Sequence, residues 1–252
     1  MTVEETETAP PPLEPVPEDW SRGLVVVAHP DDIEYGSAAA IARWTAQGKS
    51  IAYCLVTSGE AGIDGIPPEQ AGPLREAEEQ ASAAVVGVEE VEFLGYPDGV
   101  VEYGLGLRRD IARVIRRQRP EIVVTVNFRE TFGASMLNQA DHIAAGRAVL
   151  DAARDAGNRW VFRELLDEGL EPWSGVRAIL AGGSPEAAHA VDTTDTFDLG
   201  VESLRAHRAY LEGLGPDHPD PAEFLEGFAR AQGTRLGCRF ATSFELYPLQ
   251  LF

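Results

Sequence analysis

GLVVVAHPDDIEYG, residues 23–36, begins as an apolar run and ends in a turn that holds a histidine, a proline and two adjacent aspartates. A short continuous apolar run is typical of a strand that is buried on both faces of a parallel sheet. We predict that this strand ends at Ala28 and delivers His29, Asp31 and Asp32 at its carboxyl end. The stretch therefore predicts a buried strand and a concentration of charge at one edge of the sheet.

Further apolar runs follow along the chain and alternate with segments of helical patterning. The expected strands are residues 23–28, 50–57, 91–95 and 121–127, with two weaker ones at 175–182 and 189–194. The expected helices, bounded by Gly and Pro signals, are residues 34–48, 73–87, 106–120, 139–157, 196–214 and 221–237. This alternation predicts the α/β class, with a mostly parallel sheet and helices on both faces in a three-layer sandwich.

The chain divides into a short arm and one large domain. Residues 1–19 mix Pro, Glu and Thr with few large apolar side chains, which predicts a flexible or surface-laid arm. Residues 20–252 are long enough to form a single domain with a sizeable core. We interpret the tail YPLQLF (247–252) and the acidic arm as features of specialisation or of contacts in a homo-oligomer.

Net charge and cysteine usage exclude several classes of function. The formal net charge of −20 argues against nucleic acid or an anionic membrane as a partner, because both are held by clustered Lys and Arg. No apolar run reaches the length of a membrane span, and the N-terminus lacks the pattern of a signal peptide. Cys54 and Cys238 are the only cysteines and lack paired spacing, so we expect a cytoplasmic protein without a disulfide framework.

Polar loops follow four of the expected strands and meet at one edge of the sheet. The first loop lacks the G-x-G-x-x-G pattern of dinucleotide binding, and its two aspartates would repel a pyrophosphate. His29 and Asp32, joined by His142 from the fourth loop, form a set of three ligands that suits a catalytic Zn²⁺. Asp31 is then free to accept the proton of a water molecule. The alternative is that each motif is only a turn or the start of a helix.

At this point the chain resembles the LmbE/PIG-L family of zinc-dependent N-acetylglucosaminyl deacetylases. The resemblance rests on AHPDDIE (28–34), TSGEAG (57–62), REAEEQ (75–80), LGYPDG (94–99) and ADH (140–142). It implies a Rossmann-like fold for residues 20–252 and a hydrolase that removes an N-acetyl or similar N-acyl group from an amino-sugar-containing small molecule.

The resemblance also implies roles for individual residues. His29, Asp32 and His142 correspond to the zinc ligands, and Asp31 corresponds to the general base that acts on a metal-activated water. The positions that contact the sugar substrate correspond to Arg75 and Asp98, and also to His207, for which a packed or surface position is the alternative.

The last motif departs from the His-x-Asp-His pattern of the family, because this chain has Gln139 at the place of the first histidine. A glutamine amide donates hydrogen bonds but cannot supply a proton at neutral pH. We therefore expect Gln139 to stabilise the oxyanion and Asp31 to return its proton to the leaving amine. Asp141 is expected to orient a metal-bound imidazole, with a helix N-cap as the alternative.

Two other interpretations stay open at this stage. Fe²⁺ is the alternative ion, since a His-Asp-His set also suits iron. A non-catalytic, degenerate carbohydrate-binding member of the same fold is the alternative function, and Gln139 is the residue that favours it. The sequence does not identify the true substrate.

Overall fold

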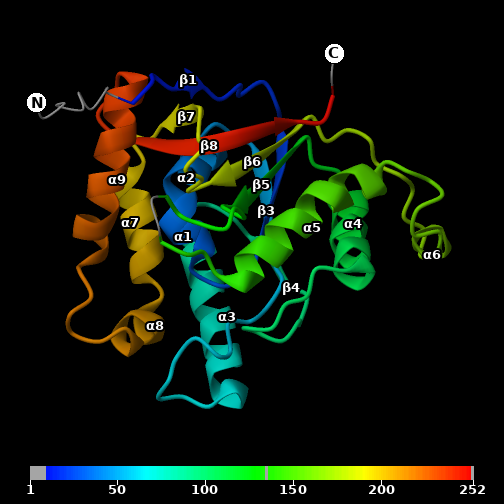
Figure 1. Ribbon diagram of the computed structural model, residues 1–252, viewed down its shortest axis with the longest axis horizontal. Coiled ribbons are helices and arrows are strands. Elements are labelled where there is room, and N and C mark those ends of the chain that lie inside the picture. The colour runs from blue at the N-terminus through cyan, green and yellow to red at the C-terminus, as the bar shows by residue number, and fades with distance from the viewer. Residues whose placement is uncertain (1–9, 134–135, 251–252) are drawn as a thin grey trace, which may run out of the picture.

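The computed structural model describes residues 10–133 and 136–250, and within them eight strands form one sheet (Figure 1). The strand order is β1-β7-β8-β6-β5-β2-β3-β4. The strands are β1 (Glu14–Pro15), β2 (Arg22–Val27), β3 (Ser50–Leu55), β4 (Glu90–Phe93), β5 (Ile122–Val126), β6 (Ala178–Gly182), β7 (His189–Asp192) and β8 (Ala241–Pro248). Only β8 pairs antiparallel to its neighbours among these strands, which confirms the predicted mostly parallel α/β sheet.

Helices cover both faces of the sheet (Figure 1). The helices are α1 (Asp32–Gly36), α2 (Ala38–Ala46), α3 (Pro68–Val85), α4 (Leu105–Gln118), α5 (Ala140–Ala156), α6 (Glu164–Asp167), α7 (Phe197–Arg205), α8 (Arg208–Gly213) and α9 (Pro221–Leu236).

Each face of the sheet has its own hydrophobic core. Side chains alternate along β2, so Val25 and Val27 pack with α2 and α3, whereas Leu24 and Val26 pack with α4 and α5. Both sets are almost completely buried, which holds β2 rigidly in the middle layer.

Three of the predicted helices have different bounds. The segment predicted as one helix over 34–48 is two helices, because Ser37 leaves helical geometry (φ −146°). The helix predicted from Pro73 begins at Pro68, since the pair Pro67–Pro68 supplies its N-cap and first position, and Pro73 lies inside it. The helix predicted over 196–214 is interrupted near His207 (φ −79°, ψ 60°).

The ends of the described chain join the sheet. β1 pairs with β7, and Leu13 and Val16 beside it are buried, so residues 10–19 lie along the sheet edge. Tyr247 and Pro248 of the tail end β8, a strand that the sequence patterning missed. Residues 1–9 of the arm and 251–252 of the tail lie outside the described residues.

Candidate active site

The turn after β2 places three polar side chains at the carboxyl edge of the sheet. The N–H groups of Ala28 and His29 donate to Oδ2 of Asp32, at 3.0 and 2.8 Å. Asp31 has φ +95° and ψ −25°, a left-handed conformation that is uncommon for a residue with a side chain. This backbone geometry separates the two aspartates: Asp32 faces His142, and Asp31 faces Arg75.

His29, Asp32 and His142 lie close enough together to hold a metal ion, with ligand atoms within 4.8 Å of one another. Nε2 of His142 lies 2.9 Å from Oδ1 of Asp32, and Nδ1 of His29 lies 3.7 Å from Oδ2 of Asp32. Among the described residues, this buried Nε2 of His142 has no aligned hydrogen-bond partner. Two imidazoles and a carboxylate around an unpartnered nitrogen are the donor set that Zn²⁺ or Fe²⁺ prefers, so the residues fit a metal.

Hydrogen bonds on the outer side of each histidine fix the orientation of its ring. Nδ1 of His142 lies 2.8 Å from Oδ1 of Asn138. Nε2 of His29 lies 3.0 Å from Asp98 and 3.2 Å from Asp141. Such partners of metal-binding histidines set the tautomer and the ring position. Each ring therefore presents its other nitrogen to Asp32.

Asp141 also anchors the loop that follows β4. Its carboxylate accepts hydrogen bonds from the N–H groups of Gly99 and Val101, at 2.7 and 3.0 Å. Burial opposes protonation of His29, but hydrogen bonds with Asp141, Asp32 and Asp98 outweigh it and raise the pKa of His29 to about 12. Carboxylates therefore surround the His29 ring and favour a positive charge there, either a proton or a metal ion that displaces it.

Asp31 lies beside the three candidate ligands and pairs with a buried arginine. Nη2 of Arg75 lies 3.0 Å from Oδ2 of Asp31, and its guanidinium also donates to the carbonyl groups of Pro30 and Gly59. Burial raises the pKa of Asp31 to about 6, although the charge of Arg75 acts in the opposite direction. A carboxyl group with this pKa can exchange a proton near neutral pH.

The glycines of the TSGEAG loop make room for this arginine. A Cβ atom at Gly59 or at Gly62 would lie 2.3 Å from Nη1 of Arg75. Gly59 also has φ +62°, which favours glycine. The motif thus shapes the enclosure in which Arg75 reaches Asp31.

Arg75 and Asp98, two of the residues expected to contact the substrate, form hydrogen bonds and ion pairs with other groups of the protein. Arg75 is 2% exposed and bonded as described above. Oδ1 of Asp98 contacts His29, and Oδ2 accepts the N–H of Ala61 at 2.8 Å. Both residues therefore support the chemical groups of the site, and their contact with a sugar stays a prediction.

His207 does not reach the open edge of the site. It is 0% exposed and lies between Glu34 and Glu79, with Nε2 at 3.5 and 3.6 Å from them. The packed position, which was the alternative for this residue, is where the structure places it, and its contact with a substrate stays a prediction. The reason for this position is the interruption between α7 and α8, which turns His207 into the interior.

Gln139 is exposed at the N-cap position of α5, three residues before His142. Asn138, which precedes it in the chain, contacts His142, and the rings of Phe132 and His142 lie 6.0 Å apart. These side chains form the open rim of the site.

Sequence reasoning missed three residues of this region. Glu79 accepts the N–H of Asp31 at 3.4 Å. Tyr210 lies beside the Asp31 carboxyl, and Cζ of Arg75 lies 4.7 Å from the centroid of the Tyr210 ring. Asn138 orients His142. Glu79 follows Arg75 by four residues, the spacing of one helix face, and this signal was available in the sequence.

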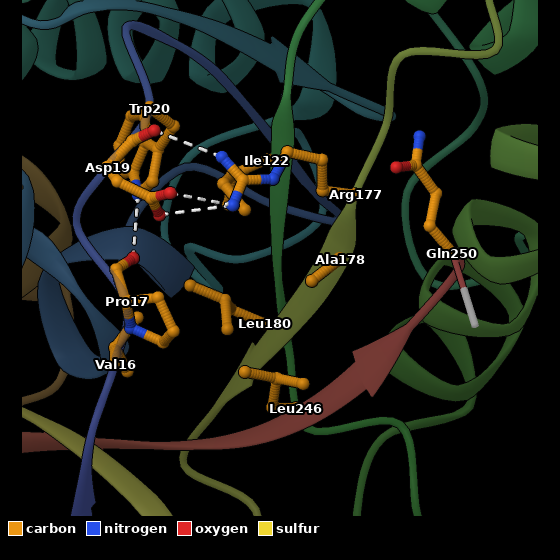
Figure 2. Close-up of a pocket in the computed structure, with 10 residues that line it drawn as sticks. All are labelled: Val16, Pro17, Asp19, Trp20, Ile122, Arg177, Ala178, Leu180, Leu246 and Gln250. Atoms are coloured by element: carbon orange, nitrogen blue, oxygen red, sulfur yellow. Dashed lines mark hydrogen bonds and ion pairs between the residues drawn. The ribbon is translucent and has the colours of Figure 1, made fainter. Parts of the chain in front are cut away.

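A cavity of about 290 Å³ lies at the opposite edge of the sheet (Figure 2). It is lined by the first residues of β5 and β6, Ile122 and Ala178, and bordered by an ion pair between Arg177 and Asp19. Because the candidate ligands follow the carboxyl ends of the strands, this cavity is separate from the candidate active site.

Comparison with known proteins gives consistent matches. Residues 24–153 match the PIG-L family, described as GlcNAc-PI de-N-acetylase. A diacetylchitobiose deacetylase of Thermococcus kodakarensis is 27% identical over 232 residues, which cover 91% of this chain and 84% of that protein. A 1D-myo-inositol 2-acetamido-2-deoxy-alpha-D-glucopyranoside deacetylase of Thermobispora bispora is 32% identical over 216 residues, which cover 73% of this chain and 63% of that protein.

A solved structure shows the same fold. The N,N'-diacetylchitobiose deacetylase from Pyrococcus horikoshii superposes with a TM-score of 0.81 at 24% identity, covering 92% of this chain and 85% of that one. In the part of the chain that the structure describes, no helix has the length and apolar character needed to cross a membrane.

Proposed function

Because the chain belongs to the PIG-L family of GlcNAc-PI de-N-acetylases, we propose that it is a metal-dependent hydrolase that removes an N-acetyl group from an amino-sugar-containing small molecule. The observation that carries the proposal is the convergence of His29, Asp32 and His142, with Asp31 beside them and held by Arg75. Both relatives described above are named as deacetylases of N-acetylated amino sugars, which supports this class of substrate.

His29, Asp32 and His142 are the residues that would hold the ion, with Zn²⁺ as the first candidate and Fe²⁺ as the alternative. When bound, such an ion supplies Lewis acidity, which polarises a carbonyl group and lowers the pKa of water. Asp141 and Asn138 hold the two imidazole rings in the orientation that this binding needs.

The remaining steps belong to side chains of the protein. Asp31 accepts a proton from the attacking water while the water oxygen forms a bond with the acetamide carbonyl carbon. The Gln139 amide donates a hydrogen bond to the oxygen that becomes negative. Asp31 then returns the proton to the nitrogen as the carbon–nitrogen bond breaks, which leaves acetic acid and a free amine. The acid loses its proton at neutral pH, and the amine takes one up. Arg75 keeps the carboxylate of Asp31 in place throughout.

Metal content and primary-amine release test the proposal together. We expect purified wild type to bind about one metal ion per chain and to release amine from a panel of N-acetylglucosaminyl compounds. His142→Ala should lose both the metal and the activity, because it removes a ligand. Asp31→Asn should keep the metal and lose activity by about 100-fold or more, because general-base catalysis contributes about 10²–10⁴-fold.

Other results would contradict the proposal. A wild-type protein that takes up no Zn²⁺ or Fe²⁺ and still binds an N-acetylglucosaminyl compound would support the non-catalytic, carbohydrate-binding alternative. An Asp31→Asn variant with full activity would remove Asp31 from the mechanism while leaving the metal site intact.

A further inference from the structure

The backbone of Asp31 is held in an unfavourable conformation. Its φ of +95° lies in the region that favours glycine and is unfavourable for other residues. A conformation of this kind persists only where surrounding contacts impose it. The contacts that impose it are therefore part of the site.

One such contact comes from α3, beneath the turn. Oε2 of Glu79 accepts the N–H of Asp31 at 3.4 Å, while Arg75, one helical turn earlier, holds the Asp31 carboxylate. Glu79 is 0% exposed, and among the described residues its Oε1 has no hydrogen-bond partner. Burial and the nearby charge of Glu34 raise the pKa of Glu79. In either protonation state its Oε2 presents an acceptor to the Asp31 N–H.

A buried histidine lies within ion-pair distance of Glu79. Nε2 of His207 lies 3.6 Å from Oε2 of Glu79 and 3.5 Å from Oε2 of Glu34. Glu34 is bonded in turn to Ser82 of α3, and Ser82 lies 2.7 Å from Ser203 of α7. The cluster thus ties α1, α3 and α7 together directly below the turn that carries Asp31.

The same interruption between α7 and α8 brings Tyr210 against the Asp31 carboxyl. Two residues of the corner at 206–210 therefore affect Asp31. His207 lies against Glu79, which accepts the Asp31 N–H, and Tyr210 contacts the Asp31 carboxylate.

We infer that Glu79, supported by His207, is a positioning residue that holds Asp31 in its left-handed conformation and so aims the carboxylate of the general base. This inference rests on the proposed function, because it assigns to Asp31 the role of base. It adds a residue of α3 and a helix corner, about 50 and 175 residues further along the chain, to the machinery of the site.

Two variants at one position separate this role from general packing. Glu79→Gln keeps an oxygen that can accept the Asp31 N–H, whereas Glu79→Leu has similar volume and no acceptor. We expect Glu79→Leu to lower kcat about 10- to 100-fold, with KM and metal content within about twofold of wild type, because displacing a reacting group by about 1 Å has this effect. Glu79→Gln should keep kcat within about threefold.

Crystal structures of both variants give a readout that does not depend on activity. In Glu79→Leu we expect Asp31 to leave the left-handed region, and in Glu79→Gln we expect φ to stay near its present value. If the wild type released no amine from any compound of the panel, the proposed function would fail. The difference in φ of Asp31 between the two variant structures would still show whether Glu79 holds this residue in place.

A third variant guards against a folding defect in Glu79→Leu. His207→Gln removes the support without touching Asp31 and should lower kcat by a smaller factor, with metal content unchanged. Asp155→Asn, which weakens a buried pair with Arg108 near the end of α5, is the control for loss of stability alone and should keep kcat. Equal values of kcat and equal φ at Asp31 in Glu79→Gln and Glu79→Leu would overturn the inference.

Discussion

Oδ2 of Asp141 lies 3.2 Å from Nε2 of His29, on the side of the ring that faces away from Asp32. The two residues are 112 positions apart in sequence, and the contact connects the turn after β2 to the first turn of α5. Because Asp141 also binds the N–H groups of Gly99 and Val101, one carboxylate fixes a histidine ring and a loop at once.

This relationship predicts the effect of Asp141 on metal affinity. Asp141→Ala leaves His29, Asp32 and His142 in place but frees the His29 ring, so we expect Zn²⁺ affinity to fall by about 10- to 100-fold. Competition for Zn²⁺ with a chromophoric chelator measures this affinity. Asp151→Asn, on the exposed side of the same helix, is the control and should keep wild-type affinity. Unchanged affinity in Asp141→Ala would show that Asp98 alone orients the ring.

The TSGEAG loop predicts a steric effect on Arg75. In Gly62→Ala the new Cβ would lie 2.3 Å from Nη1 of Arg75, whereas a Cβ at Gly65 would meet nothing within 4 Å. We expect Gly62→Ala to lower stability by about 1–3 kcal/mol, because a buried guanidinium loses hydrogen bonds, and to lower kcat as Asp31 loses its partner. Gly65→Ala should resemble wild type in denaturant unfolding and in amine release. Equal behaviour of the two variants would mean that Arg75 can move at little cost.

The fold was predictable where local patterns agree with the tertiary structure. β2, β3 and β5 are short apolar runs that end in polar loops, and α4 and α5 end at a proline and a glycine as expected. β8 escaped prediction because most of its residues are half-buried and it joins the sheet antiparallel between β6 and β7, a pairing that only the tertiary structure decides. The interruption near His207 escaped prediction because residues 205–210 contain neither Gly nor Pro to mark it.

The residues of the candidate site were predictable where they lie in short continuous sequence motifs. His29, Asp31 and Asp32 lie in the turn after β2, and His142 lies in the first turn of α5, which follows β5, so the topology brings them together. Contacts between distant elements were not visible: Asp98 was expected at the sugar, but its carboxylate lies against His29. Tyr210 carried no motif at all, and only the packing of α8 against α3 shows its place beside Asp31.

An ion pair outside the site predicts how stability depends on pH. Burial opposes ionisation of Glu245, but hydrogen bonds with Arg129, Ser184 and Tyr247 outweigh it and lower the pKa of Glu245 to about 2. A lowered pKa in the folded state means that the stabilisation is present above the unfolded pKa, near 4.5, and is lost as pH falls toward 2. Glu245→Gln should therefore unfold at lower urea concentration than wild type at pH 7, and the difference should shrink between pH 5 and pH 3. A difference that is constant over this range would assign the effect to packing instead of charge.

Gln139 occupies the position that decides whether the site is catalytic or degenerate. It is exposed at the N-cap of α5, three residues before His142, and we propose that its amide reaches a bound acetamide group. If the amide N–H stabilises the oxyanion, Gln139→Ala should lower kcat by about 100-fold, with metal content and KM little changed, because losing one such donor costs about 10²–10³-fold.

Gln139→Glu is the matched variant: it keeps the size of the side chain, removes the N–H donor and adds a negative charge, so it should be at least as impaired as Gln139→Ala. Steady-state amine release from the best compound of the panel measures both. Full activity in Gln139→Ala would exclude this residue as the donor and leave the backbone of the rim to supply the hydrogen bond.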